Sequence, residues 1–189
     1  MKTALITGGA QGIGRGIVTR LRADGWRVAV LDRDPQALAA VRDADPEVLC
    51  LDCDVGNEAQ VLAAMQAVGD WLSGSGLDLL VSNAGIANPV SGPIQDLSLA
   101  DWRRWQDSHV TGAFLTIRGA VALLRKAGGS IVMIASTRAL QSEPFCEGYA
   151  AAKGALCGMT HALAVSLGPA IRVNAVLPGW IETGPWQKA

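Results

Sequence analysis

The stretch TALITGGAQGIGRGIVTRLRA, residues 3–23, decides the fold of this chain. Residues 3–7 are mostly apolar and of strand type, a glycine-rich turn follows at residues 8–14, and residues 15–23 have an amphipathic helical pattern. This order predicts a phosphate-binding element, because glycines allow close backbone approach and the helix N-terminus offers free N–H groups. The same glycines are also compatible with a tight turn that only packs the helix closely against the strand.

A second signal follows at the next predicted strand, residues 27–31, which ends at Asp32. Asp32 lies eighteen residues after Gly14, about where a dinucleotide-binding fold places the acid that holds the adenosine ribose hydroxyls. A carboxylate accepts two hydroxyl hydrogen bonds and repels a 2′-phosphate, which favours NAD over NADP. Arg33 keeps NADP open, since an arginine at this place can pair with a 2′-phosphate.

A candidate acid–base group lies in the second half of the chain. Residues 149–156 are rich in helix formers, so Tyr149 and Lys153, four residues apart, are expected on one helix face. A cation beside a phenol favours the phenolate, and lowering the tyrosine pKa by about 3 units needs roughly 4 kcal/mol. Tyr149 would then act as a general acid/base near neutral pH. Taken alone, the pair also fits a half-buried tyrosine beside a solvated lysine.

Together these segments resemble the short-chain dehydrogenase/reductase family over essentially the whole chain. The motifs that carry the resemblance are Thr7–Gly14 with the spacing Thr-Gly-x3-Gly-x-Gly, Asp54-Val55, Ser82-Asn83-Ala84-Gly85, Ser136, Tyr149 with Lys153, and Pro178–Thr183. The resemblance implies that the cofactor is bound by Gly8, Gln11, Gly12, Ile13, Gly14, Asp32, Asp54, Val55, Asn83, Ala84, Gly85, Tyr149, Lys153, Pro178, Gly179, Ile181 and Thr183. It also implies that Ser136 holds the substrate oxygen, Tyr149 moves the proton, and Lys153 holds the nicotinamide ribose and lowers the tyrosine pKa.

One catalytic position departs from the family pattern. The family usually has an asparagine in Asn-x-x-Gly-x-Phe, whereas this chain has His109 in the segment HVTGAF, residues 109–114. In the family that residue supports a water linking the lysine to solvent, partly through its backbone carbonyl, so a histidine could preserve the relay. His109 could also titrate near pH 6.5 and add its own pH dependence. The alternative is a histidine that only fills a buried helix position.

The order of elements predicts an α/β fold. Strands are expected near residues 2–7, 27–32, 47–53, 77–82, 129–135 and 171–177, and helices near 13–24, 35–43, 57–73, 98–127 and 147–168. This alternation predicts a three-layer, doubly wound parallel sheet of the Rossmann type, with strand order 3-2-1-4-5-6 and the cofactor at the carboxyl edge. We expect one domain over residues 1–189 that lacks the family's C-terminal seventh strand. The sixth strand would then be a bare edge, with Trp180 and Trp186 near the mouth of the site.

Composition restricts the partners of the protein. The net charge is −1 and no basic stripe is present, which argues against nucleic acid. No apolar run approaches the roughly 18 residues of a membrane span, and the predicted fold begins directly after Lys2 without a signal peptide, so we expect a cytoplasmic protein. Cys50 and Cys53 are expected on opposite faces of one strand without a second pair, which favours buried reduced thiols over a metal site.

The sequence therefore predicts an NAD-dependent oxidoreductase that interconverts an alcohol and a ketone or aldehyde. The alternative is a dinucleotide-binding protein without efficient catalysis. The substrate stays open, because Ile86, Val90, Leu140, Pro144 and Phe145 suggest a partly apolar pocket, whereas Gln141, Ser142, Glu143 and Glu147 suit a polyol. The resemblance also implies a homodimer or homotetramer paired through the helices near 98–127 and 147–168. The small residues of the second helix would equally suit packing against its own sheet.

Overall fold

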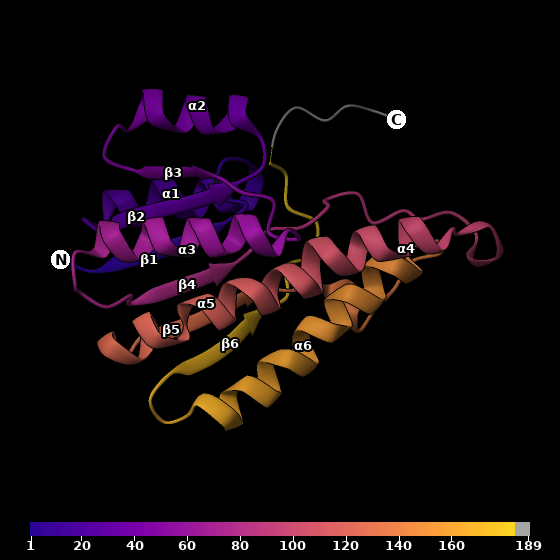
Figure 1. The fold of residues 1–189 in the computed structure, drawn as a ribbon. Coiled ribbons are helices and arrows are strands. Elements are labelled where there is room, and N and C mark those ends of the chain that lie inside the picture. Colours follow the sequence, from indigo (N-terminus) through magenta and orange to yellow (C-terminus); the bar gives the residue numbers. More distant parts are fainter. Residues whose placement is uncertain (184–189) are drawn as a thin grey trace.

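A parallel sheet forms the centre of the molecule in the computed structural model, which describes residues 1–183 (Figure 1). Its strands are β1 (Thr3–Thr7), β2 (Arg27–Asp32), β3 (Leu49–Asp52), β4 (Leu79–Ser82), β5 (Ser130–Ile134) and β6 (Arg172–Val176). They lie in the order β3-β2-β1-β4-β5-β6, and every neighbouring pair is parallel. The predicted Rossmann architecture and strand order are confirmed.

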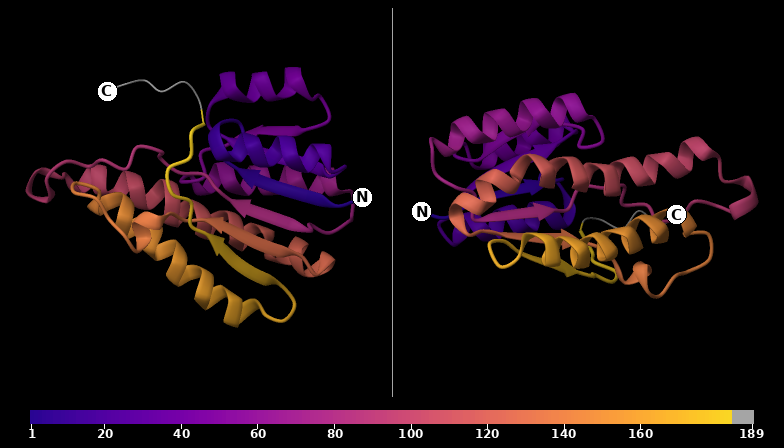
Figure 2. Two further views of the ribbon diagram at one scale, coloured as in Figure 1. Left: turned by 180° about the vertical axis from the view of Figure 1, so that it is seen from behind. Right: turned by 60° about the horizontal axis from the view of Figure 1, so that its bottom comes forward.

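Helices cover both faces of this sheet, which gives the three predicted layers (Figures 1 and 2). On one face lie α3 (Glu58–Leu72), α5 (Gly112–Ala127) and α6 (Glu147–Leu167), and on the other lie α1 (Gly12–Ala23) and α2 (Pro35–Ala44). All five residues of β1 are buried, because this strand has helices above and below it and strands on either side. The order of the strands reverses beside β1, so a crevice opens at its carboxyl end.

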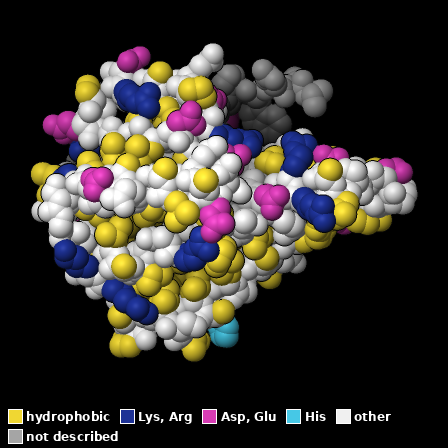
Figure 3. Space-filling model, viewed as in Figure 1, with side chains coloured by type: hydrophobic (Ala, Val, Ile, Leu, Met, Phe, Trp, Pro, Cys, Tyr) yellow, Lys and Arg dark blue, Asp and Glu magenta, His cyan; other side chains and the backbone are white. Residues whose placement is uncertain are grey.

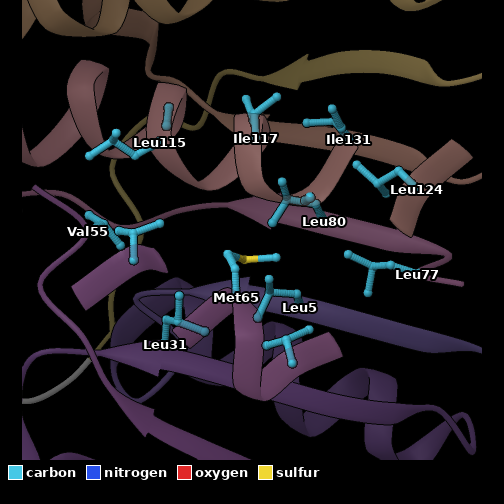
Figure 4. Close-up of a cluster of buried hydrophobic side chains, with 14 of the residues drawn as sticks. Leu5, Leu31, Val55, Met65, Leu77, Leu80, Leu115, Ile117, Leu124 and Ile131 are labelled. Atoms are coloured by element: carbon cyan, nitrogen blue, oxygen red, sulfur yellow. The ribbon is translucent and has the colours of Figure 1, made fainter. Parts of the chain in front are cut away.

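The larger of the two hydrophobic clusters fills the space between the sheet and the helices α3, α5 and α6. Figure 4 shows Met65 of α3 among sheet residues that include Leu5 and Leu80. Leu5, Leu80 and Ile131 are fully buried there, and removing such a side chain typically costs about 2–5 kcal/mol. This cluster holds the carboxyl ends of the strands in fixed register, and those ends carry the candidate site.

The helix predicted over residues 98–127 is interrupted in the structure. It consists of α4 (Leu99–Trp105), a π-helical segment η2 (Gln106–Thr111) and α5. The π-helical segment is followed by a closely packed residue, Gly112. A Cβ at Gly112 would lie 2.5 Å from the Val55 side chain. A π-helical turn contains more residues than an α-helical turn, so it changes the direction of the side chains around it. Such turns are frequent at functional sites. Here the segment carries His109.

The strand β6 pairs only with β5 among residues 1–183, as expected for an edge strand. Trp180 lies within the described residues, whereas Trp186 lies outside them. Within residues 1–183, no helix has the length and hydropathy needed to cross a membrane.

Candidate active site

A cleft of about 1160 Å³ opens at the carboxyl ends of the strands. The residues that line it come from the glycine turn, the ends of β2 to β5, the π-helical segment, α6 and the segment after β6. With one exception, every site residue predicted from the sequence lines this cleft. The exception is Gly14, which is buried in α1 behind the cleft wall.

The glycine turn forms one end of the cleft. Gly8 has a φ of +62°, and a Cβ there would lie 2.9 Å from the Cα of Ala84, so a larger residue would be both strained and overpacked. A Cβ at Gly14 would lie 2.0 Å from the carbonyl oxygen of Gly8. Gly14 therefore allows the helix to pack on the turn, and it is not among the residues that line the cleft.

The first turn of α1 has backbone donors to spare. The N-cap residue Gln11 makes no side-chain capping bond, and its amide instead donates to the Asp34 carboxylate at 2.6 Å. The first N–H groups of a helix need partners from outside the helix. These donors, together with the positive end of the helix dipole, fit a pyrophosphate group held against the turn.

Asn83 braces the glycine turn from the neighbouring strand. Its side-chain amide donates to the carbonyl oxygens of Thr7 at 3.0 Å and Gly8 at 2.9 Å. The Thr7 hydroxyl in turn accepts from the backbone N–H groups of Asn83 and Ala84, both at 3.0 Å. Asn83, which the sequence predicts to bind the cofactor, thus fixes the shape of the glycine turn by binding the backbone carbonyls of Thr7 and Gly8.

The acid at the end of β2 faces the same cleft. One oxygen of the Asp32 carboxylate accepts from the Ala10 N–H at 3.0 Å and the other from the Asp34 N–H at 3.2 Å. Each oxygen keeps a second lone pair for a further donor. Arg33 is exposed and lines the cleft, as do Asp54 and Val55.

Three of the four predicted catalytic side chains, those of Ser136, Tyr149 and Lys153, come together at the other end. Ser136 follows β5, and Tyr149 and Lys153 lie one turn apart on α6. The Lys153 ammonium donates to the Ile134 carbonyl at 2.8 Å and lies 5.5 Å from the centre of the Tyr149 ring. Burial lowers the pKa of Lys153 to about 8, which leaves the side chain cationic at neutral pH.

The environment of Tyr149 differs from the one predicted. Burial raises the pKa of Tyr149, although the hydroxyl of Ser136 and the charge of Arg138 act in the opposite direction. Lys153 is not among the groups that shift this pKa, and the net shift is opposite to the lowering that the sequence predicted.

His109 is buried against Tyr149 and Gly85. Its imidazole is 2% exposed and meets the Tyr149 ring edge-on, with the ring centres 5.5 Å apart. Neither ring nitrogen has a hydrogen-bond partner among the described residues, although the backbone of Ile86 lies close enough to favour the protonated ring slightly. Burial and then the charge of Lys153 lower the pKa of His109 to about 3. The histidine is therefore neutral near pH 7, and the titration near pH 6.5 that the sequence suggested is wrong.

Of the two sets of candidate substrate residues that the sequence left open, the polar set contributes more to the cleft. Of the five apolar candidates only Ile86 lines it, whereas Leu140 is 82% exposed. Gln141, Ser142 and Glu143 do line the cleft, and Glu147 does not. Sequence reasoning missed Arg138, whose side chain is 11% exposed and lines the cleft two residues after Ser136. Its position two residues after Ser136, the predicted catalytic serine, was the available signal.

The two neighbouring cysteines pack into different cores. Cys53 belongs to the cluster under α3 and α5, and Cys50 packs against the cluster under α1 and α2, which confirms that they face opposite ways. Burial raises the pKa of both thiols, that of Cys53 to about 11. In the part of the chain that the structure describes, no three His, Cys, Asp or Glu side chains gather as a metal site would require.

Known proteins share this arrangement. A family model described as enoyl-(acyl carrier protein) reductase matches residues 8–189. The chain is 37% identical to an uncharacterized oxidoreductase of Thermotoga maritima, over 99% of this chain and 74% of that protein. It is 40% identical to a 3-alpha-(or 20-beta)-hydroxysteroid dehydrogenase of Mycobacterium bovis, over 96% of this chain and 70% of that one.

The chain belongs to the short-chain dehydrogenase/reductase family. A solved member, the 3-ketoacyl-(acyl-carrier-protein) reductase of Brucella melitensis complexed with NADH, superposes with a TM-score of 0.88 at 32% identity, over 94% of this chain and 75% of that one. Membership makes the protein an oxidoreductase of the kind that acts on CH–OH groups with a nicotinamide dinucleotide. The glycine turn with its uncapped helix N-terminus fits such a cofactor.

Proposed function

We propose that this protein interconverts an alcohol and a ketone or aldehyde with NAD as the cofactor, and that Tyr149 is the general acid/base. The observation that carries the proposal is the convergence of Ser136, Tyr149 and Lys153 in one cleft with the glycine turn. We further propose that residues 1–189 act as one dinucleotide-binding domain. Bound in this cleft, the nicotinamide would supply or accept the hydride.

Each side chain has a distinct role in this proposal. The Ser136 hydroxyl donates to the substrate oxygen and stabilises the charge that develops on it. The phenolic oxygen of Tyr149 gives a proton to that oxygen in reduction and takes one in oxidation. The Lys153 ammonium holds the nicotinamide ribose. Neutral His109 has a nitrogen lone pair and an N–H group beside these residues, which suits a water-linked proton relay.

Three groups of residues would hold the cofactor. The N–H groups at Gly12 and Ile13 suit the pyrophosphate, and Asp54 and Val55 border the place for the adenine. The segment after β6 would lie against the nicotinamide; its residues that line the cleft are Pro178, Gly179, Ile181 and Thr183. The backbone around Ala84 and Gly85 completes the wall between the two ends.

The preference for NAD rests on Asp32. Its carboxylate has lone pairs left for two ribose hydroxyls, and its charge would repel a 2′-phosphate. Arg33 is exposed and makes no ion pair among the described residues. Parallel fluorescence titrations with NADH and NADPH test the preference, and tighter NADPH binding would mean that Arg33 overrides Asp32.

The assignment of Tyr149 is tested by Tyr149→Phe. Turnover should be abolished while NADH affinity stays nearly unchanged, because only the transferable proton is removed. Tyr149 is the only tyrosine of the chain, so the phenolate absorption of the wild type reports its titration directly, with the variant as the blank. Turnover of the variant at the wild-type rate would refute the role of Tyr149. Intact NADH binding by the wild type without turnover on a broad panel of alcohols and ketones would instead favour a binding protein without efficient catalysis.

We also propose that two copies pair through α5 and α6. The helix α6 exposes a row of small residues, and a Cβ at Gly154 or Gly158 would meet nothing within 4 Å. Packing on the protein's own sheet therefore does not account for these two glycines. Figure 3 shows hydrophobic side chains on the face formed by these helices, and Val165 of α6 is 74% exposed. Such a surface suits close approach of a second helix pair.

A further inference from the structure

The side chain of Arg138 lines the cleft close to Ser136, and the proposed reaction does not use it. It is mostly buried, with its guanidinium 5.3 Å from the centre of the Trp180 ring, and it forms an ion pair with Glu143. The Lys153 ammonium already donates to the Ile134 carbonyl, and Arg33 follows Asp32 at the other end of the cleft. Among the cleft residues, Arg138 is therefore the one arginine or lysine that faces the substrate side without a catalytic role.

We propose that Arg138 binds a carboxylate carried by the substrate, so that the protein acts on hydroxy acids or oxo acids. This inference rests on the proposed oxidoreductase function and names the substrate class for the same site. A single guanidinium presents a planar fork of donors that matches one carboxylate. A phosphate would ordinarily need more positive charge than this half of the cleft supplies.

The position of Arg138 fits this role. Its backbone N–H donates to the Ser136 hydroxyl oxygen at 3.2 Å. Arg138 therefore lies next to the hydroxyl group that would hold the reacting oxygen of the substrate. Arg138 and Gln141 line the same cleft as Ser136 and Tyr149, so both are available to a substrate held there. The guanidinium also acts on the reacting region, since its charge partly opposes the rise in the pKa of Tyr149 that burial causes.

Glu143 is a counterion that a substrate can displace. Its side chain is 55% exposed, whereas that of Arg138 is 11% exposed. An exposed ion-pair partner contributes little net energy, because water stabilises it equally well when it swings out. The arginine has no such freedom, because it is held under Trp180 and inside the cleft. Glu143 thus keeps Arg138 paired until a substrate carboxylate replaces it.

The experiment compares two probes that differ in charge, 3-hydroxybutanoate and its methyl ester, in the wild type, Arg138→Gln and Glu143→Gln. The measured quantity is the ratio of kcat/KM for the acid to kcat/KM for the ester. Arg138→Gln should lower this ratio by about tenfold or more, the usual effect of losing a charge-assisted hydrogen bond. Glu143→Gln should raise the ratio, since it removes the competing carboxylate. Arg20→Gln is the matched control, because Arg20 pairs with Asp24 on the exposed face of α1.

The opposite signs separate binding from a merely structural ion pair. If Arg138 and Glu143 only hold the loop together, both variants will lower activity on both probes and leave the ratio unchanged, which overturns the proposal. If neither probe is turned over although NADH binds, the broad panel of alcohols and ketones decides the proposed function separately. Calorimetric binding of 3-hydroxybutanoate to the NADH-loaded protein then decides the inference. Binding that Arg138→Gln removes and Glu143→Gln strengthens supports it, and equal binding in all three proteins overturns it.

Discussion

At the scale of single residues, burial determines the protonation states of the site. His109 and Tyr149 are both pushed toward their neutral forms, and Lys153 is cationic at neutral pH although burial opposes its charge. The two aromatic side chains touch, and the ammonium lies next to both. The positive charge that a bound cofactor and substrate would experience there therefore comes from Lys153 and Arg138.

The protonation of His109 has a measurable consequence for stability in acid. Folding lowers its pKa from 6.5 to about 3, so below pH 6.5 the unfolded chain binds a proton that the folded protein does not. The free energy of unfolding therefore falls as the pH falls through this range. Between about pH 7.5 and pH 5 the wild type should lose about 2 kcal/mol more than His109→Asn.

Urea unfolding at the two pH values measures this difference. His161→Asn is the matched control, because His161 is the other histidine of the chain and is exposed. The control should lose as much stability as the wild type. Equal losses in the wild type and His109→Asn would show that the buried imidazole takes up a proton in the folded state.

At the scale of elements, the loop after β4 packs against the π-helical segment where Gly85 meets the His109 ring. A Cβ at Gly85 would lie 2.0 Å from two atoms of the His109 ring, which cannot move aside easily because it is buried against Tyr149. Gly85→Ala should therefore lower the free energy of unfolding by about 1–3 kcal/mol. It should also lower kcat, since Tyr149 lies on the far side of the ring.

A double-mutant cycle tests this contact. In a His109→Ala background the ring is gone, so Gly85→Ala should cost clearly less than in the wild type. Gly69→Ala in α3 is the control, because a Cβ there meets nothing within 4 Å, and it should be neutral or stabilise by about 0.5–1 kcal/mol. Additive effects of the two changes would contradict the contact.

The same elements show what the sequence could and could not predict. The strands and most helix ends follow from apolar runs and capping residues such as Asp34 and Asn57, which act locally. The cleft residues followed from motif spacing. The π-helical segment did not, because it depends on how Gly112 meets Val55 from a distant loop. The orientation of Arg138 and the exposure of Leu140 likewise depend on tertiary contacts that no local pattern records.

At the scale of the whole molecule, the exposed face of α6 predicts self-association. Ala162 is exposed on this helix near Val165. In a pair of copies joined through α6, Ala162→Glu would bury a charge without a partner, so the variant should dissociate into monomers at concentrations where the wild type is dimeric or larger. Light scattering over a range of concentrations measures the mass of both proteins. A monomeric wild type at the highest concentration would remove the prediction of self-association.

The cytoplasmic location of the protein stays a prediction.

The π-helical segment also makes the helix that contains it sensitive to the deletion of a single residue. An α-helix turns by about 100° per residue, so deleting one codon between residues 106 and 111 would let α4 and α5 join as one regular helix. The residues on one side of the deletion would then rotate by that angle relative to the other side. His109 would turn out of the cleft, or the apolar stripe of α5 would leave the core. A single-codon deletion, which most surface loops tolerate, would here act as strongly as a substitution in the active site.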